Sequence, residues 1–375
     1  MKKRIAEFVK KEAILSIASI LAVISMFIVK PDAGYADYID FHTLAILFTL
    51  MVVMEGLRQL GVFDKIARVM LSKADDLKKL SFIMVFMCFI SAMLITNDVA
   101  LITFVPFTLL LLSMAGLTDK AIEIVVYETV AANLGSMLTP IGNPQNLYLF
   151  TVSGMGIGEF LKITAPITAL SAVLLVICCV LIPSKEIKTM DLSVAQQQED
   201  SGKNRIAIIY FIVVFILALC CVLKVLPVWI PFVIALVGTL FIKRSVLKEV
   251  DYCLLLTFVS FFVLIGNLGR IEAISTILKQ VMEGREILIS FLSSQVISNV
   301  PAAVLLSGFT TDYAALIKGT NIGGLGTLIA SLASLISFKR FSVENPDKKG
   351  KYLGYFTLVN VVFAVVLLVF TFLIS

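Results

Sequence analysis

The chain has 375 residues, of which 59% are hydrophobic and only 15% charged, and its formal net charge is +5. Soluble domains carry about 25% charged residues, so this composition predicts an all-α polytopic membrane protein. The single histidine, His42, excludes HExxH zinc sites, Ser-His-Asp triads and Cys-His dyads, and no P-loop motif occurs. An enzyme or an ATP-driven pump is therefore not expected. The basic residues lie in loops between spans and do not indicate nucleic-acid binding.

Apolar segments follow one another along the whole chain. A membrane-spanning helix needs about 20 residues, and several segments approach that length. No cleavage site follows the basic stretch 1–13, so we expect it to remain as a cytoplasmic N-terminus before a first span. The six cysteines lie within apolar segments and lack metal-ligand or disulfide spacing. The segments are 14–29, 41–57, 80–115, 121–150, 163–182, 206–223, 228–242, 252–268, 286–309, 313–338 and 353–374.

Segment 80–115 carries three polar residues at its centre. A single helix of that length would be about 54 Å long, which exceeds a bilayer core of about 30 Å. We therefore predict a re-entrant hairpin with Thr96, Asn97 and Asp98 at its tip. A carboxylate at membrane depth is costly and usually functional, so Asp98 is interpreted as a Na⁺ site or a proton carrier. The alternative is that Asp98 only caps a helix.

Segment 121–150 predicts a broken helix. Its second half, ANLGSMLTPIGNPQNLYLF, holds glycines and prolines that an unbroken helix does not accommodate, and more amide side chains than lipid tolerates. We expect an unwound centre that faces the hairpin tip, because non-helical backbone at this depth must be buried or line a cavity. Glu128, five residues before Asn133, is expected to face the same cavity. Glu55 and Arg58, three residues apart on a helix, are expected to form a local ion pair.

Three stretches recur in the same order in the second part of the chain. The offsets between the copies fall steadily from 211 to 202 and 188, as expected for repeats with shorter loops in the second copy. Chance similarity between apolar helices is the alternative, but matched polar residues such as Asn97 and Asn299 count against it. The pairs are DFHTLAILFTLMVV from Asp40 with DYCLLLTFVSFFVL from Asp251, MLITNDVALI from Met93 with QVISNVPAAV from Gln295, and NLGSMLTPIGNPQN from Asn133 with NIGGLGTLIASLAS from Asn321.

The repeat predicts a second hairpin, 286–309, and a second broken helix, 313–338. The second tip keeps a hydroxyl and an amide as Ser298 and Asn299, but a valine follows them in place of the acid. Lys318, just before the second break, has three interpretations: it attracts an anion, it replaces a bound cation, or it only extends to the outer surface. The glycines of this break have a further interpretation, which is close helix packing.

Loop charges orient the chain. If the N-terminus is cytoplasmic and the first hairpin returns to its own side, 24 of the 31 Lys and Arg residues lie inside, as the positive-inside rule requires. The extra helix 206–223 then gives the two copies opposite orientations, and inverted repeats are typical of secondary transporters. We therefore expect a first inverted repeat at 14–182, a cytoplasmic linker with a connecting helix at 183–227, and a second inverted repeat at 228–375. The C-terminus is expected outside.

The tips TND and SNV, together with TPIGNPQN in the first break, resemble the ion transporter superfamily over nearly the whole chain. That group includes citrate-transporter-like proteins, divalent anion:sodium symporters, arsenite permeases and NhaD-type sodium–proton antiporters. Its best-known symporters carry Ser-Asn-Thr at both tips. The acid that follows Asn97 here is more similar to the arsenite permease and NhaD branches. The family fold implies a homodimer in which a mobile transport domain moves against a scaffold.

The resemblance also implies which residues bind ligands. A cation site would be formed by Thr96, Asn97 and Asp98 with the chain around Asn133, Gly135 and Ser136, and the substrate would lie between the two tips. Residues expected at the substrate are Thr139, Asn143, Pro144, Asn146, Ser298, Asn299, Lys318, Thr320, Asn321 and Gly323.

The expected function is secondary active transport of a small anion, either a di- or tricarboxylate or an inorganic oxyanion. Transport would be coupled to Na⁺ or H⁺ through the Asp98 tip by alternating access. The alternative is a sodium–proton antiporter without an anion substrate. No cofactor or metal other than Na⁺ is expected. The protein is expected to be a multi-pass protein of the cell membrane.

Overall fold

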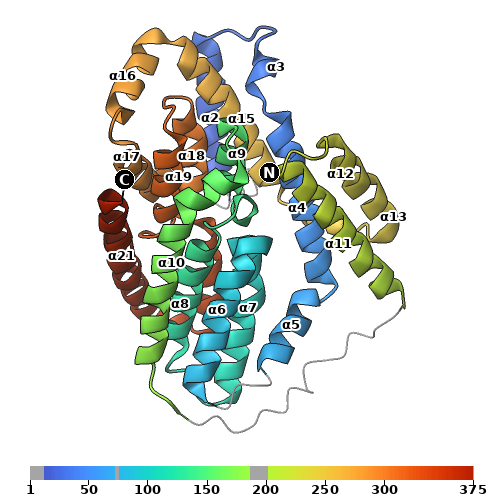
Figure 1. Ribbon diagram of the computed structural model, residues 1–375, viewed down its shortest axis with the longest axis vertical. Helices are drawn as coiled ribbons and strands as arrows, with labels where there is room; N and C mark the ends of the chain where they lie inside the picture. Colours follow the sequence, from blue (N-terminus) through green and yellow to red (C-terminus); the bar gives the residue numbers. More distant parts are fainter. Residues whose placement is uncertain (1–11, 72–75, 186–201, 375) are drawn as a thin grey trace.

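The computed structural model describes residues 12–71, 76–185 and 202–374, and every regular element in these ranges is a helix (Figure 1). Seven of the helices in these ranges are long and apolar enough to cross a membrane, which confirms the predicted all-α polytopic fold. Most of the expected N-terminal stretch 1–13 and much of the linker 183–205 lie outside the described residues. The helices are α2 (Ala13–Ile28), α3 (Tyr35–Tyr38), α4 (Phe41–Gln59), α5 (Val62–Leu71), α6 (Leu77–Ile95), α7 (Asn97–Met114), α8 (Ala121–Gly135), the 3₁₀ helix η1 (Pro140–Gly142), α9 (Pro144–Ser153), α10 (Ile157–Leu181), α11 (Gly202–Val222), α12 (Trp229–Val233), the π-helix η3 (Ile234–Gly238), α13 (Thr239–Ile242), α14 (Val246–Glu249), α15 (Tyr252–Arg270), α16 (Glu272–Met282), α17 (Glu286–Ile297), α18 (Asn299–Ser307), α19 (Tyr313–Ile322), α20 (Leu332–Glu344), the 3₁₀ helix η4 (Pro346–Lys348) and α21 (Lys349–Leu373).

The segment predicted as the first hairpin forms two helices, α6 and α7, with only Thr96 between them. The two helices pack along each other in the lower half of the molecule (Figure 1). α6 begins at Leu77, earlier than predicted, because the Asp76 carboxylate accepts a hydrogen bond of 2.8 Å from the backbone N–H of Lys79 and caps the helix. Thr96 turns the chain sharply with φ 71° and ψ 151°.

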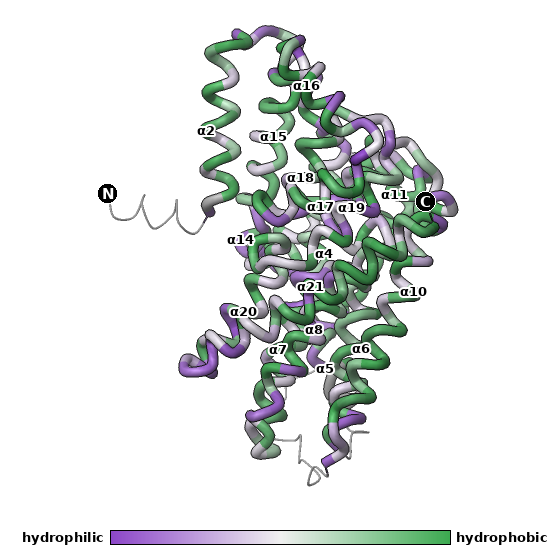
Figure 2. The backbone as a smooth tube through the Cα atoms, turned by 90° about the vertical axis from the view of Figure 1, so that its left-hand side faces the viewer, coloured by the Kyte–Doolittle hydropathy of each residue, from purple (hydrophilic) through white to green (hydrophobic). Residues whose placement is uncertain are grey.

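The second predicted hairpin has the same construction. α17 and α18 are separated only by Ser298, whose φ of 74° and ψ of 153° nearly equal those of Thr96. This pair lies in the upper half of the molecule, whereas α6 and α7 lie in the lower half (Figures 1 and 2). The matching tips support the internal repeat. The inverted relation of the copies and the re-entrant placement of both pairs in a bilayer stay predictions.

Both predicted helix breaks are present. α8 ends at Gly135 and α9 begins at Pro144, with Thr139 and Asn143 in extended conformations. Each of these two residues precedes a proline, which disfavours the helical region of φ and ψ for the residue before it. In the second half, α19 ends at Ile322 and α20 begins only at Leu332.

Glycines at the breaks let helices approach closely. A Cβ added to Gly135 would lie 2.8 Å from the carbonyl carbon and 2.9 Å from the Cα of Phe89 in α6. A Cβ added to Gly323 would lie 2.7 Å from the Cβ of Ser294 in α17. The two breaks are therefore packed against the first arms of their own hairpins, and close packing accounts for Gly323.

We expect Gly135→Ala to destabilise the protein by about 2 kcal/mol, because the new methyl group overlaps backbone that cannot rotate away. Thermal unfolding of the purified protein in detergent measures this loss. Gly158→Ala in α10 is the matched control, since nothing lies within 4 Å of its added Cβ. Equal stability of the two variants would contradict the close approach of α8 and α6.

Candidate functional site

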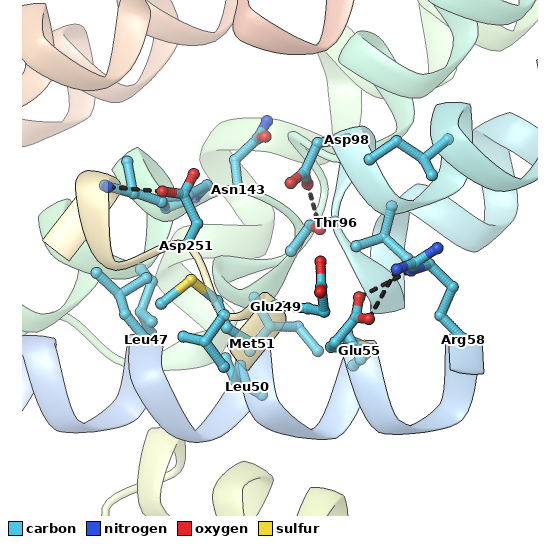
Figure 3. Close-up of a pocket in the computed structure, with 18 of the residues that line it drawn as sticks. Leu47, Leu50, Met51, Glu55, Arg58, Thr96, Asp98, Asn143, Glu249 and Asp251 are labelled. Atoms are coloured by element: carbon cyan, nitrogen blue, oxygen red, sulfur yellow. Dashed lines mark hydrogen bonds and ion pairs between the residues drawn. The ribbon is translucent and has the colours of Figure 1, made fainter. Parts of the chain in front are cut away.

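A cavity of about 330 Å³ lies between α4, the tip of α6 and α7, the start of α9, and the junction of α14 with α15. Four of the predicted site residues line it: Thr96, Asp98, Asn143 and Pro144. Figure 3 shows Thr96 and Asp98 pointing into this space, with α4 forming the opposite wall. The first hairpin tip and the first helix break thus share one cavity.

The three tip residues point in two directions. The Thr96 hydroxyl donates a hydrogen bond of 2.5 Å to the Asp98 carboxylate, and both side chains reach the cavity. Asn97 is buried instead: its Nδ2 donates to Oδ1 of Asn133 at 2.9 Å, while its own Oδ1 accepts from the backbone N–H of Asp98. Asp98 lies in the first turn of α7, where the helix dipole stabilises a negative charge. Asn97 therefore anchors the tip to α8 on the side away from the cavity, and Asp98 presents its carboxylate to the cavity.

Asn133 connects the first tip to the second half of the chain. Its Oδ1 also accepts a hydrogen bond of 2.9 Å from the Ser331 hydroxyl, and its Nδ2 donates to the Ser334 hydroxyl at 3.0 Å. Ser331 and Ser334 belong to the start of α20, after the second break. Asn133 is almost fully buried. Its amide therefore bonds to the tip and to the second broken helix together.

The other polar residues of the first break mainly hold its shape. Asn143 donates from Nδ2 to the Ser136 hydroxyl, which in turn donates to the carbonyl of Asn133 at 2.9 Å. The Thr139 hydroxyl donates to the carbonyl of Met93 in α6. These bonds satisfy polar groups that lipid could not.

The predicted residues of the second half do not line the cavity. Asn321 donates from Nδ2 to Oδ1 of Asn146 at 2.7 Å, which links the two breaks, and the Ser298 hydroxyl donates to the Ala330 carbonyl at 3.3 Å. Thr320 bonds to its own helix at the carbonyl of Leu316. Lys318 is half-buried in α19. None of the six predicted residues of the second half lines this cavity, and neither do six of the first half; the twelve are Asn97, Asn133, Gly135, Ser136, Thr139, Asn146, Ser298, Asn299, Lys318, Thr320, Asn321 and Gly323.

Several cavity residues were absent from the predicted site. The carboxylates of Glu249 and Asp251 reach the cavity from the α14–α15 junction, and Glu55 and Arg58 reach it from α4 (Figure 3). The pairing of Glu55 with Arg58 was predicted from their spacing and is confirmed at 2.7 Å. Glu249 and Asp251 have no such local signal, because they are far from the tip in the sequence.

Gln145 is another polar residue that was absent from the predicted site. Its side chain is fully buried, and neither its Oε1 nor its Nε2 has a hydrogen-bond partner. Oδ1 of Asn321 is also without a partner. Buried polar groups are nearly always hydrogen-bonded, so these atoms are free to bond to water or to a ligand. The amide-rich stretch GNPQN contained the signal for Gln145.

The cavity carries more negative than positive groups. Four carboxylates face one guanidinium, and Arg58 already donates two hydrogen bonds of 2.7 Å to Glu55. The other carboxylates lining this cavity therefore need protons, cations or water to balance their charge. Glu128, which was expected to face the cavity, does not line it and is fully buried in α8.

The fold and the cavity define a polytopic membrane protein with a cavity among its helices that is lined by charged side chains. A model of the citrate transporter family matches residues 5–320, and the chain belongs to this family. It is a membrane transporter of the citrate and arsenite permease type. An uncharacterized transporter of Methanocaldococcus jannaschii is 34% identical over 302 residues, which cover 80% of this chain and 81% of that protein.

Two further relatives extend the comparison. The inner membrane protein YbiR of Escherichia coli is 31% identical over 322 residues, which cover 84% of each chain. The silicon efflux transporter LSI3 of Oryza sativa is 32% identical over 142 residues, which cover 37% of this chain and 28% of that protein. The similarity to the first two proteins spans most of both chains.

We expect Asn133→Ala to destabilise the protein by about 1–3 kcal/mol, because buried donors of Asn97 and Ser331 lose their shared acceptor. Thermal unfolding in detergent measures the effect. Asn345→Ala is the control, since that amide makes one long bond of 3.5 Å at the end of α20. The connecting role of Asn133 is refuted if both variants unfold at the same temperature.

Proposed function

We propose that the protein is a secondary active transporter in which the Asp98 tip binds the coupling cation, Na⁺ or H⁺, and the cargo is a small anion. The main support is the position of Asp98, whose carboxylate faces the 330 Å³ cavity from the start of a helix. An intramembrane carboxylate at such a place is expected to bind or carry an ion. Thr96 supplies a second oxygen next to it.

The start of α9 supplies groups for the cargo. Asn143 is the N-cap residue of α9, but its side chain makes no hydrogen bond to the helix N–H groups. Asn143 and Pro144 line the cavity, so the positive end of the α9 dipole lies at its wall. Helix N-termini of this kind bind anions, and in transporters they point at anionic substrate groups. The cargo we propose is a di- or tricarboxylate or an inorganic oxyanion.

Charge balance gives an order to the binding steps. A cation on Asp98 cancels one of the four negative charges that an arriving anion meets. We therefore propose that the cation binds first and that the loaded site then changes the side of the membrane to which it opens. The homodimer, the cytoplasmic N-terminus and the external C-terminus, which resemblance and loop charge imply, belong to this proposal.

Sodium–proton antiport without an anion is the second candidate, and the surplus of carboxylates favours it. The guanidinium of Arg58 is already paired, so the cavity attracts cations more readily than anions when Asp98 is ionised. In that case Asp98 would exchange Na⁺ for H⁺ in turn.

We expect Asp98→Asn to reduce cation-driven uptake at least tenfold, because the amide keeps the shape of the carboxyl but binds neither Na⁺ nor an exchangeable proton. A loss of about 1.4 kcal/mol in cation binding suffices for that factor. Uptake of citrate, succinate, sulfate and arsenite into proteoliposomes under a Na⁺ or H⁺ gradient measures it. Asp37→Asn on the exposed helix α3 is the control. Unchanged coupled uptake in Asp98→Asn would disprove the assignment.

A proton-flux assay separates the two candidates. Proteoliposomes with an internal pH dye and no added anion receive a pulse of Na⁺. Anion transport predicts no movement of protons until an anion is supplied, since the site must carry its cargo. Antiport predicts an immediate change in internal pH that Asp98→Asn abolishes. Such a change would replace the anion proposal with the antiport one.

A further inference from the structure

Glu128 is a buried acid that the proposed transport site does not use. It lies in α8, has no exposed surface, and does not line the cavity. Its Oε1 is 2.5 Å from the hydroxyl of Thr108 in α7, which is also fully buried. Its Oε2 has no hydrogen-bond partner. One hydrogen bond is few for a carboxyl group that offers about four acceptor positions when ionised.

The surroundings of Glu128 do not compensate a negative charge. No ion pair reaches it from any Lys or Arg in the described part of the chain. The titratable groups that interact with its charge are Cys88 of α6 and Tyr352 of α21, and neither is a cation. Burying an unpaired carboxylate costs several kcal/mol, whereas a neutral carboxylic acid costs far less. This packing therefore holds the group as an acid with its proton.

Thr108 suits a site whose proton comes and goes. A threonine hydroxyl donates to a carboxylate and equally accepts from a carboxylic acid. The 2.5 Å contact between Thr108 and Glu128 thus persists in both charge states. Ionisation leaves Oε2 with a negative charge that requires hydrogen-bond donors, and Oε2 is the atom without a protein partner. Water admitted next to it would therefore stabilise the ionised form.

Glu128 also lies where the two halves of the chain meet. The next residue, Thr129, is 2.6 Å from the hydroxyl of Ser337 in α20, and Ser337 is 3.2 Å from the Tyr352 hydroxyl. These three hydroxyls form a buried polar cluster among α8, α20 and α21. The ring of Phe341 packs against that of Tyr352, with the ring centroids 4.6 Å apart, and all four side chains are fully buried. A separation of these helices would therefore be needed to expose the cluster to water.

We propose that Glu128 is a second proton-binding site of the transporter, distinct from Asp98, which releases its proton to water when α7, α8 and α20 separate during the transport cycle. The step is the dissociation of the carboxylic acid into a carboxylate and a proton, followed by the reverse reaction when the helices close. The site is distinct because Glu128 does not line the cavity that Asp98 faces, and its carboxyl group is hydrogen-bonded to Thr108 and not to the tip residues. The inference rests on the proposed cation-coupled transport.

The test is the pH dependence of transport by the full-length variant Glu128→Gln in proteoliposomes. Glutamine keeps the size and the Thr108 hydrogen bond but cannot release a proton. We expect the transport rate of Glu128→Gln to lose its dependence on pH on one side of the pH profile, where titration of a single group changes the rate about tenfold per pH unit. Asp98→Asn, in contrast, should lose coupling at every pH. The matched control is Glu123→Gln, in the same helix at a half-buried ion pair with Lys120, which should retain the wild-type profile.

Infrared difference spectra of the purified protein supply a readout that does not need transport. We expect carboxylic-acid C=O absorption of the wild type to decrease at high pH, and the part of this decrease that belongs to Glu128 to be missing in Glu128→Gln but retained in Asp98→Asn. If Glu128→Gln does not fold, Thr108→Val takes its place and should shift both this absorption and the pH dependence of transport. A wild-type profile in Glu128→Gln, or an acid band that does not respond to pH or to the substitution, overturns the proposal.

The two proposals fail in different ways. If the wild type shows no cation-coupled flux of any kind, the proposed function is wrong, and the infrared titration alone then decides whether Glu128 exchanges a proton. If coupled flux is present and depends on Asp98 but Glu128→Gln transports with the wild-type pH profile, only the inference about Glu128 is wrong.

Discussion

The hydrogen bond from Asn97 to Asn133 is the contact on which the site depends. A chain that stops being helical inside a membrane must satisfy its polar groups within the protein. The side chain of Asn97 joins the tip of α6 and α7 to the end of α8 through its hydrogen bond to Asn133. Asn133 is in turn hydrogen-bonded to Ser331 and Ser334 at the start of α20. Because this contact fixes the back of the tip, the Asp98 side chain can face the cavity.

The two halves use one backbone design for two purposes. Thr96 and Ser298 have nearly the same dihedral angles, and each joins two helices without a loop. The first tip then presents Asp98 to a cavity, whereas the matched Val300 is buried in an apolar cluster with Phe258 and Phe262. The geometry of the tip is therefore separable from its chemistry. A single position after the Asn determines whether a tip presents a carboxylate to a cavity or packs in the core.

The sequence predicted the parts of the site that are marked locally. A Thr-Asn-Asp triplet inside an apolar run, and prolines beside amides in the next one, are enough to predict a tip and a break. The start of α6 was missed by a few residues because the Asp76 cap lies outside the apolar run that defined the segment. Glu249 and Asp251 were missed for a stronger reason: their relation to Asp98 arises only when α14 and α15 pack near the tip. No periodicity or motif reports a contact between residues so far apart.

Asp98 and Glu128 show how a membrane transporter can place acids at two levels of access. Asp98 borders a cavity, so its carboxylate can be reached by an ion that enters this space. Glu128 is fully buried in α8, which packs against helices from both halves, so in our proposal its charge state changes when those helices move. An ionised acid that is carried into a closed, apolar environment pays a large desolvation cost. Movement is therefore cheapest when Asp98 holds its cation and Glu128 its proton, and a transporter that moves mainly in that state couples its cargo to the ions without a further gate.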